Sequence, residues 1–520
     1  MSKSSNKAKL IVVALIWLVV VGICAAVYKL WIAPGKEAEI VTQTGSDRRH
    51  EHQLRLAIDS FSGYSLLRSR AFHDDLAARG IGLDLVDDAA DYGRRIEALR
   101  DGDVQLAVFT VDALVKASAI LGELPGTIVM VIDETTGADA MVAYKQAVPN
   151  VDSLNRDEAR LVVTRDSPSE TLARVVMARF NLPKLSADPW IDAGGAEDVY
   201  EQFKKADPAA PRAYVLWEPY VSKALEDDRA HVLIDSSKFR GYIVDVLVVQ
   251  REFLAEDERG PRLLKKVIEA YLRANFDYQR RAGGLADLVQ EDARAQLDER
   301  LSDAQSARLV ESIWWKNTQE NYGHFGILSG GYSGGLQHLD EMIRNVTDVL
   351  VKTSAISADP AGGEPNKLYY DRLLKDLHAE SFHPSVLAGE GSEAIRSDNV
   401  AAPLSDAQWE KLSPVGELGV GNIVFARGAS ALREQSQREL ASLAGILASW
   451  PQYYLLVRGH ARADGDAEAN RALAENRAQA VVEYLVQQGV PSQRVRRQSM
   501  PPGGAGESQS VSFVVGQLAY

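Results

Sequence analysis

Cysteine is almost absent from this chain of 520 residues, and its single example, Cys24, lies inside an apolar run at residues 10–28. The chain after that run therefore has no thiols from which to form a disulfide. Because large domains do not need covalent cross-links, this absence decides nothing about the cellular compartment. The length suggests about two to four domains. With 46% hydrophobic residues, each can bury a sizeable hydrophobic core.

An excess of positive charge is also missing. The chain has 58 Lys and Arg against 72 Asp and Glu, which gives a formal net charge of −14. Domains that bind nucleic acid are typically basic. The composition therefore argues against a nucleic-acid partner.

The usual sequence signatures of catalysis and of cofactor binding are lacking. The nine histidines show no metal-binding spacing such as His-Glu-x-x-His, and no Walker-type phosphate loop is present. Gly331-Tyr332-Ser333-Gly334-Gly335 fits the Gly-x-Ser-x-Gly pattern of hydrolases. That pattern requires a buried strand before it, and the glycine-containing residues 324–328 make a poor one. We expect no enzyme activity, no metal and no cofactor.

Charged residues are absent from the run at 10–28, which is about long enough to span ~30 Å of hydrocarbon. Lys3, Lys7 and Lys9 precede it, so the positive-inside rule predicts a cytoplasmic N-terminus. A cleaved signal peptide is the alternative, but the run is longer than a usual signal core, and residues 25–28 form a poor cleavage site. We predict a single-pass inner-membrane anchor at residues 1–31, a polar tether at 32–52 and a largely periplasmic chain.

Short apolar strands alternate with helices through residues 53–384, which predicts the α/β fold class, mostly parallel sheets and right-handed crossovers. The predicted strands are residues 54–58, 83–86, 104–109, 127–132, 161–164, 213–216 and 243–249. The predicted helices are residues 64–79, 92–100, 111–119, 168–180, 199–205, 221–226, 263–281, 304–320 and 336–349. Two successive α/β units followed by helices indicate two lobes joined by crossing segments. Residues 385–412, rich in Ser, Gly, Ala and acidic residues, indicate a linker before a last domain at 413–520.

Four phrases in the middle of the chain carry a resemblance to a known family. They are Asp59–Tyr64, Ala98–Asp112, Asp133–Ala140 and Trp217–Tyr220. Over about residues 53–345 the chain resembles the periplasmic solute-binding proteins of ABC importers, in the group that binds nitrate, sulfonates, taurine or thiamine-type pyrimidines. The resemblance implies a two-lobed fold that closes around a small solute.

Candidate ligand-binding residues follow from their places beside predicted strand ends, where ligands usually settle in α/β folds. Hydroxyls that lie there suit an anionic group, and they belong to Ser62, Thr110, Thr135 and Ser169. Carboxylates that suit amine or amide donors belong to Asp112, Asp139 and Glu218, and rings that suit a flat ligand belong to Tyr64 and Trp217. The ligand is therefore an anion or a pyrimidine-like solute. Each hydroxyl can instead be a plain helix cap, and Asp133 or Asp139 can serve only to fix a hinge turn.

The last domain shows the order Gly459-His460-Ala461-Arg462, then Gly465, Asn470, Leu473 and Arg477-Ala478. This order resembles the OmpA-like peptidoglycan-associated domain, an α+β module. In that family an aspartate after the strand and an arginine on the next helix hold the diaminopimelate of the wall peptide. Asn470 and Arg477 match the family pattern, and an arginine there suits a bidentate carboxylate contact.

One position departs from that pattern, because Arg462 stands where the family has its aspartate. Asp464, two residues further on, is a possible substitute acid. Arg477 can alternatively pair with Glu475 or Glu483 on its own helix. Two interpretations therefore remain open for this domain, namely peptidoglycan binding and a structural or protein-binding role.

Together these features predict a periplasmic small-solute-binding protein of an ABC-importer-like system, anchored in the inner membrane and oriented by its OmpA-like domain. Hinge segments at residues 138–144 and 231–245 would absorb the closure of the lobes. The expected partners are the solute, an ABC permease, peptidoglycan and the inner membrane. The alternative is an envelope scaffold or sensor that uses the binding fold as a docking module.

Overall fold

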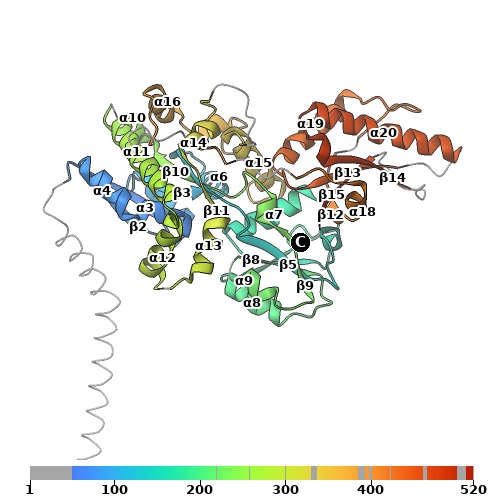
Figure 1. Ribbon diagram of the computed structural model, residues 1–520, viewed down its shortest axis with the longest axis horizontal. Helices are drawn as coiled ribbons and strands as arrows, with labels where there is room; N and C mark the ends of the chain where they lie inside the picture. The colour runs from blue at the N-terminus through green and yellow to red at the C-terminus, as the bar shows by residue number, and fades with distance from the viewer. Residues whose placement is uncertain are drawn as a thin grey trace, which may run out of the picture. The chain divides into compact units, whose positions relative to one another are not determined.

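The computed structural model (Figure 1) describes residues 50–217, 220–256, 258–298, 300–328, 336–384, 393–396, 401–421, 423–460, 465–500 and 511–518. The predicted anchor at 10–28, the serine pattern at 331–335, and Glu218, Arg462 and Asp464 lie outside these ranges. Within the ranges, no helix has both the length and the apolar character needed to cross a membrane.

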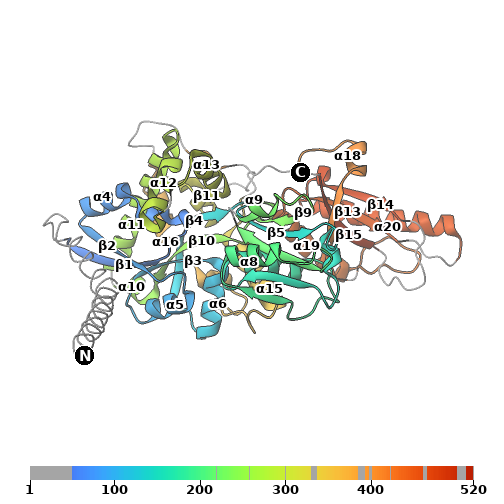
Figure 2. The ribbon, with the colours of Figure 1, turned by 90° about the horizontal axis from the view of Figure 1, so that it is seen from below.

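The first lobe is built on a six-stranded sheet of order β11-β4-β10-β3-β1-β2. Its strands are β1 (His52–Ile58), β2 (Ile81–Asp87), β3 (Leu106–Thr110), β4 (Gly126–Thr135), β10 (Val244–Gln250) and β11 (Ile313–Trp315). Every residue of β3, β4 and β10 is buried, as expected for a sheet covered by helices on both faces. Figure 2 shows α5 (Tyr92–Arg100) and α6 (Val111–Leu121) on one side, and α11 (Arg259–Arg280) and α12 (Gly284–Leu297) on the other.

The second lobe contains a five-stranded sheet of order β7-β6-β8-β5-β9. Its strands are β5 (Asp139–Tyr144), β6 (Arg160–Thr164), β7 (Trp190–Ala193), β8 (Arg212–Trp217) and β9 (Ala230–Asp235), and its helices are α7 (Pro168–Arg179), α8 (Ala196–Lys204) and α9 (Tyr220–Ala224). The prediction of mostly parallel sheets was wrong, because antiparallel pairing joins β10 to β3 and β4, β4 to β11, and β5 to β8 and β9. Each sheet nevertheless combines with helices into a lobe of its own. The predicted α/β class with two lobes is therefore confirmed.

The chain crosses between the lobes twice, through residues 136–138 from β4 to β5 and through residues 236–243 from β9 to β10. These connectors are shorter than the predicted hinges at 138–144 and 231–245. Residues 139–144 form strand β5, and residues 231–235 belong to β9. The predicted hinges were too wide because residues 139–144 and 231–235 were not recognised as strands.

Two helices predicted from apolar spacing are broken in the structure. Residues 64–79 form η2 (Ser62–Tyr64), α3 (Ser65–Arg68) and α4 (Arg70–Ala78), because the Ser69 side chain caps α4 by accepting from the Phe72 N–H. Residues 304–320 divide into α13 (Asp303–Ser312), β11 and α14 (Thr318–His324), because residues 313–315 pair with the end of β4. Tertiary pairing overrides the local helical pattern there.

The helices after the lobes pack back onto them. They include α10 (Arg251–Ala255), α15 (Leu339–Lys352) and α16 (Arg372–Ala379). Helix α15 contacts both α6 of the first lobe and α7 of the second. It therefore bridges the two lobes in addition to the hinge segments.

The C-terminal domain has a four-stranded sheet of order β12-β15-β13-β14. Its elements are α18 (Asp406–Glu410), β12 (Ser413–Glu417), α19 (Glu434–Ala448), β13 (Tyr454–Gly459), α20 (Ala467–Gln487), β14 (Val495–Ser499) and β15 (Val511–Gln517). Helix α20 packs on β13 and β14, and α19 packs on α20 (Figure 1). A single bridge joins Phe425 to Leu432 before α19.

Part of the predicted linker is held by hydrogen bonds. The Thr318 N–H donates to the Glu393 carboxylate (3.0 Å), and Asn317 Nδ2 donates to the Ala394 carbonyl (2.9 Å). The Arg396 N–H donates to Glu320 Oε1 (2.9 Å). Residues 393–396 therefore dock at the N-terminus of α14.

Candidate functional site

Three polar side chains meet at the edge of the first lobe's sheet that faces the second lobe. The strand register places Asp245 of β10 opposite Thr110 at the end of β3 and opposite Asp133 of β4. Residues directly opposite each other in adjacent strands share a face, so these side chains lie side by side. The Thr110 hydroxyl also accepts from the Ala113 N–H at the start of α6 (3.4 Å).

The two carboxyl groups in this row are difficult to ionise. Asp133 and Asp245 are at most 1% exposed, and burial raises the pKa of Asp133 to about 7. Burial and the neighbouring Asp133 charge raise the pKa of Asp245 well above its usual value, although the Tyr64 hydroxyl donates to it. Among the described residues, no N–H or hydroxyl donates to either Asp133 oxygen. Because two adjacent buried carboxylates repel each other, the pair of Asp133 and Asp245 favours one negative charge shared between them over two.

Beside this pair, a third carboxylate is neutralised within the protein. Arg95, fully buried, donates from Nε to Asp88 Oδ2 (2.7 Å) and from Nη2 to Asp59 Oδ2 (2.9 Å). Its remaining Nη1 donates to the Val108 carbonyl (2.7 Å), and the guanidinium lies 4.9 Å from the Tyr92 ring centroid. Asp59 thus has a structural partner.

The second lobe contributes two hydroxyls from the first turn of α7. Ser169 Oγ donates to Asp139 Oδ1 (2.6 Å), and Thr171 Oγ1 donates to Asp112 Oδ2 (2.5 Å). The Thr171 bond joins the lobes, because Asp112 belongs to α6. Burial raises the pKa of Asp139 to about 6, with the Ser169 bond acting in the opposite direction. Burial also raises the pKa of Asp112, again against its hydroxyl partners.

A groove of about 590 Å³ opens beside this contact, between α5 and α6 of the first lobe and the start of α7. This volume is in the range of small-molecule sites. Its acidic lining residues are Asp91, Glu97, Asp112, Asp166 and Glu170. Its cations, Lys116 and Arg174, are both engaged: Lys116 contacts Asp166, and Arg174 donates to Glu170 (2.6 Å). The groove is therefore acidic and partly apolar.

Five of the predicted ligand-binding residues come together where the lobes meet, namely Tyr64, Thr110, Asp112, Asp139 and Ser169. Of the others, Ser62 and Thr135 do not join this group, whereas Trp217 borders it. Ser62 lies half-buried on η2, and Thr135 ends β4 beside a separate small cavity. Trp217, the last residue of β8, lies opposite Asp139 in the second sheet. Glu218 lies outside the described residues.

Several site residues were not recognised from sequence, above all Asp245, Lys116 and Glu170. Asp245 had a detectable signal, because an acid inside the β-branched run 243–249 contradicts a fully apolar strand interior. Lys116 and Glu170 had none, since charged residues on helices are usually solvated. In the part of the chain that the structure describes, no three His, Cys, Asp or Glu side chains are grouped to hold a metal ion.

In the C-terminal domain, Arg477 of α20 is engaged by its own domain. Its Nε donates to the Ala429 carbonyl (3.0 Å) and its Nη2 to the Ala426 carbonyl (3.2 Å). The guanidinium also lies 5.0 Å from the Phe425 ring centroid. Asn470 lies in the first turn of the same helix, where its N–H donates to the Asp466 carbonyl.

Known proteins resemble different parts of the chain. Residues 424–509 match the model of the OmpA family. A peptidoglycan-associated lipoprotein of Brucella melitensis is 38% identical over 74 residues, which are 14% of this chain and 44% of that protein. The chain thus spans less than half the length of this relative.

Among solved structures, the periplasmic aliphatic sulphonate binding protein SsuA of Escherichia coli matches with a TM-score of 0.45 and 14% identity, over 61% of this chain and 92% of that one. DszB in complex with biphenyl-2-sulfinic acid matches with a TM-score of 0.39 and 10% identity, over 63% and 99%. The family match bears out the OmpA-like domain that the sequence suggested. Residues 424–509, which match the OmpA family model, follow a two-lobed α/β module.

Proposed function

We propose that the two-lobed module binds a small solute in the groove between α6 and α7, in the periplasm. The groove itself carries this proposal: its volume of about 590 Å³ suits a small molecule, and side chains of both lobes line it. The Thr171 to Asp112 bond joins the two lobes within the lining of the groove, so a change in the angle between the lobes would change the width of the groove.

The chemistry of the lining favours a cationic or amine-bearing solute over an anion. Five carboxylates face two cations, and carboxylates already hold both cations. Asp139, which accepts a hydrogen bond from Ser169 between the lining residues Pro168 and Glu170, adds an acid that burial makes difficult to ionise. A bound cation would supply the missing counter-charge. Of the two ligand classes left open by the sequence, the lining supports the pyrimidine-like amine.

The envelope context comes from the two ends of the chain. The apolar run at 10–28 supports an inner-membrane anchor with a cytoplasmic N-terminus. The match to the OmpA family, whose relatives include a peptidoglycan-associated lipoprotein, supports a wall-facing domain. In this arrangement the receptor stays near the membrane and can deliver its solute to an ABC permease at high effective concentration.

The experiment is a thermal-shift and calorimetric titration of the full chain in detergent. Putrescine and benzamidine serve as cations, cytosine as an uncharged aminopyrimidine, and ethanesulfonate and nitrate as anions. We expect the melting temperature to rise with saturation for a cation or the aminopyrimidine. Asp112→Asn should weaken that binding, whereas Asp157→Asn, an exposed change outside the groove, should not. Stabilisation by the anions alone would refute the cationic assignment.

A second function, an envelope scaffold or sensor, is favoured by one observation. The lobes are joined directly by Thr171 with Asp112 and by Lys116 with Asp166. A binding fold that closes on its own contacts can serve as a docking module. If no probe stabilises the chain in the titration above, this second function is the better account.

A further inference from the structure

The two segments that cross between the lobes touch each other. The Thr135 N–H donates to the Ile243 carbonyl (3.0 Å), and the Gly137 N–H donates to Ser236 Oγ (2.9 Å). Any rotation of one lobe against the other must change backbone angles within residues 136–138 and 236–243, because strands flank both segments. These two segments form the hinge, and the second one, residues 236–243, is the longer.

One turn of the C-terminal domain packs on that second segment. It comprises residues 449–453, between α19 and β13, and is called the clamp turn below. The Arg240 N–H donates to the Ser449 carbonyl (2.7 Å), and Lys238 Nζ donates to Gln452 Oε1 (3.0 Å). The ring centroid of Phe239 lies 5.0 Å from that of Trp450, which is fully buried. Three consecutive hinge residues thus contact the clamp turn.

The C-terminal domain also holds the elements on either side of the hinge. Trp450 stacks on Phe180, which follows α7 of the second lobe, at 5.8 Å between ring centroids. The Asn181 N–H donates to the Glu417 carbonyl (2.8 Å). Asn345 of α15, the helix that bridges the lobes, donates to Ser449 Oγ (3.1 Å). The domain therefore contacts the second lobe, the hinge and the bridging helix together.

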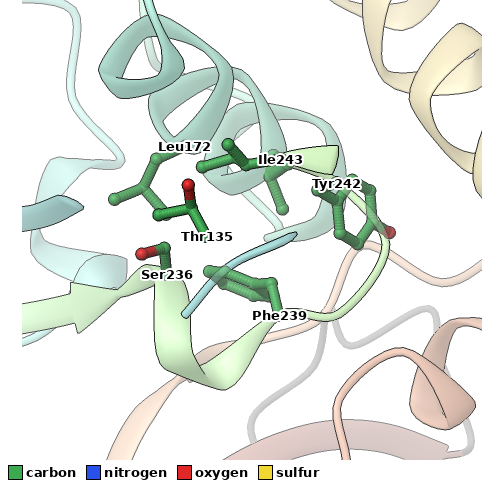
Figure 3. A pocket seen from close by; sticks show the side chains of 7 residues that line it. Thr135, Leu172, Ser236, Phe239, Tyr242 and Ile243 are labelled. Carbon is green, nitrogen blue, oxygen red and sulfur yellow. The ribbon is translucent and has the colours of Figure 1, made fainter. Parts of the chain in front are cut away.

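The hinge is not fully packed beneath this contact. A cavity of about 10 Å³ lies between α7 and the hinge (Figure 3). Figure 3 shows Leu172 of α7 on one side and Phe239, Tyr242 and Ile243 of the second hinge segment around the space, with Thr135 at the end of β4. Side chains that border a void lack contact partners on that side. Phe239 keeps its ring contacts with Tyr242, Trp450 and Tyr453 on its other sides.

We propose that the clamp turn couples the angle between the lobes to the position of the OmpA-family domain. A rotation that moves residues 238–240 must move the clamp turn or break its bonds, since both backbone and ring contacts join them. The coupling is reciprocal by thermodynamic necessity. Closure of the lobes changes the position of the C-terminal domain, and a force or binding partner that acts on that domain changes the angle between the lobes. A solute-dependent response rests on the function proposed above, but the mechanical coupling does not.

The test measures the distance between the lobes without any ligand. Spin labels are placed at positions 70 and 205, whose side chains are 92% and 77% exposed on the first and second lobe, in full-length protein carrying Cys24→Ser. Pulsed electron–electron double resonance then measures the distance distribution between the two labels in the protein with an unaltered clamp turn and in Trp450→Ala. We expect a longer mean distance and a broader distribution in the variant, because the hinge loses its packing partner.

Trp409→Ala is the matched control. Trp409 is a half-buried tryptophan of the same domain that packs on Tyr454 (5.4 Å between centroids), away from the hinge. It should leave the distance distribution unchanged. If Trp450→Ala does not fold, Gln452→Ala removes only the bond to Lys238 and should move the distribution less, in the same direction.

Distance distributions identical to the parent in folded variants of Trp450 and Gln452 would overturn the coupling. Failure of the coupling and failure of the solute proposal are separable, because the probes of the groove play no part in this measurement. A shifted distribution together with an indifferent groove would retain the clamp turn and favour the scaffold or sensor. An unchanged distribution with a saturable solute would retain the receptor and reject the clamp turn.

Discussion

Replacing Asp139 by asparagine should stabilise the protein at neutral and alkaline pH. Asp139 is buried, and burial raises its pKa from 3.8 to about 6. Below pH 3.8 the carboxyl group is protonated in both the folded and the unfolded chain. Between pH 3.8 and about 6, the unfolded chain loses this proton and the folded one retains it. The free energy of unfolding therefore falls with rising pH across this window and stays lower above it.

The size of this effect follows from the pKa difference of about two units, which corresponds to about 3 kcal/mol above pH 6. Asparagine removes that cost, and its Oδ1 can still accept from Ser169. A lobe-sized unit of 150–250 residues gains roughly 2–4 °C per kcal/mol. In fluorescence-monitored thermal scans of the full chain at pH 8, Asp139→Asn should therefore melt about 6–12 °C higher than the parent. At pH 4 the two proteins should melt at about the same temperature.

Asp227→Asn provides the control in the same lobe. The hydrogen bonds and charge of Arg229 lower the pKa of Asp227 to about 2, so its ionised form contributes stability above the unfolded pKa that is lost as pH falls. This substitution should leave the melting temperature at pH 8 equal or slightly lower. A melting temperature of Asp139→Asn at or below that of the parent at pH 8 would refute the idea that the charge of Asp139 costs stability.

Two further substitutions test contacts of the site. Arg95→Met leaves the buried Asp59 and the half-buried Asp88 without their counter-charge. It should lower the free energy of unfolding by about 3–5 kcal/mol, measured by denaturant titration, and an unchanged transition midpoint would contradict the ion-pair assignment. Thr171→Val removes the hydroxyl that joins α7 to Asp112, a loss of about 1 kcal/mol, and should increase the radius of gyration in X-ray scattering; an unchanged radius would show that this bond does not hold the lobes together.

Much of the fold was predictable because it depends on local patterns. The helix at 92–100 begins and ends as predicted, since Asp91 caps its first turn and apolar residues follow at helical spacing. Strand β5 was missed because Gly137 and acidic residues before it resemble a turn. Its strand character comes from pairing with β8 and β9, which are distant in sequence. Long-range pairing of this kind leaves no local trace.

The residues of the site that have a local sequence signal were predicted, and those brought together by long-range pairing were not. Thr110 and Ser169 stand at helix starts, a position that sequence reveals, and the structure places both where the lobes meet. Asp133 and Asp245 are neighbours only because β10 returns into the first sheet between β3 and β4. If residues 243–249 are assigned from sequence to the second α/β unit, the contact between Asp133 and Asp245 is not expected. Chain topology, rather than residue type, decides which acids meet.

That return of β10 also fixes an order of events during synthesis. The strands of the second sheet, β5 to β9, are contiguous in sequence, so this lobe has all its parts before β10 is made. The first sheet lacks its middle strand until about 115 residues after the end of β4. At 5–20 residues per second this is a delay of about 6–23 s, during which the edges of β3 and β4 stay unpaired. The inserted lobe can therefore mature while its host lobe still needs protection from aggregation.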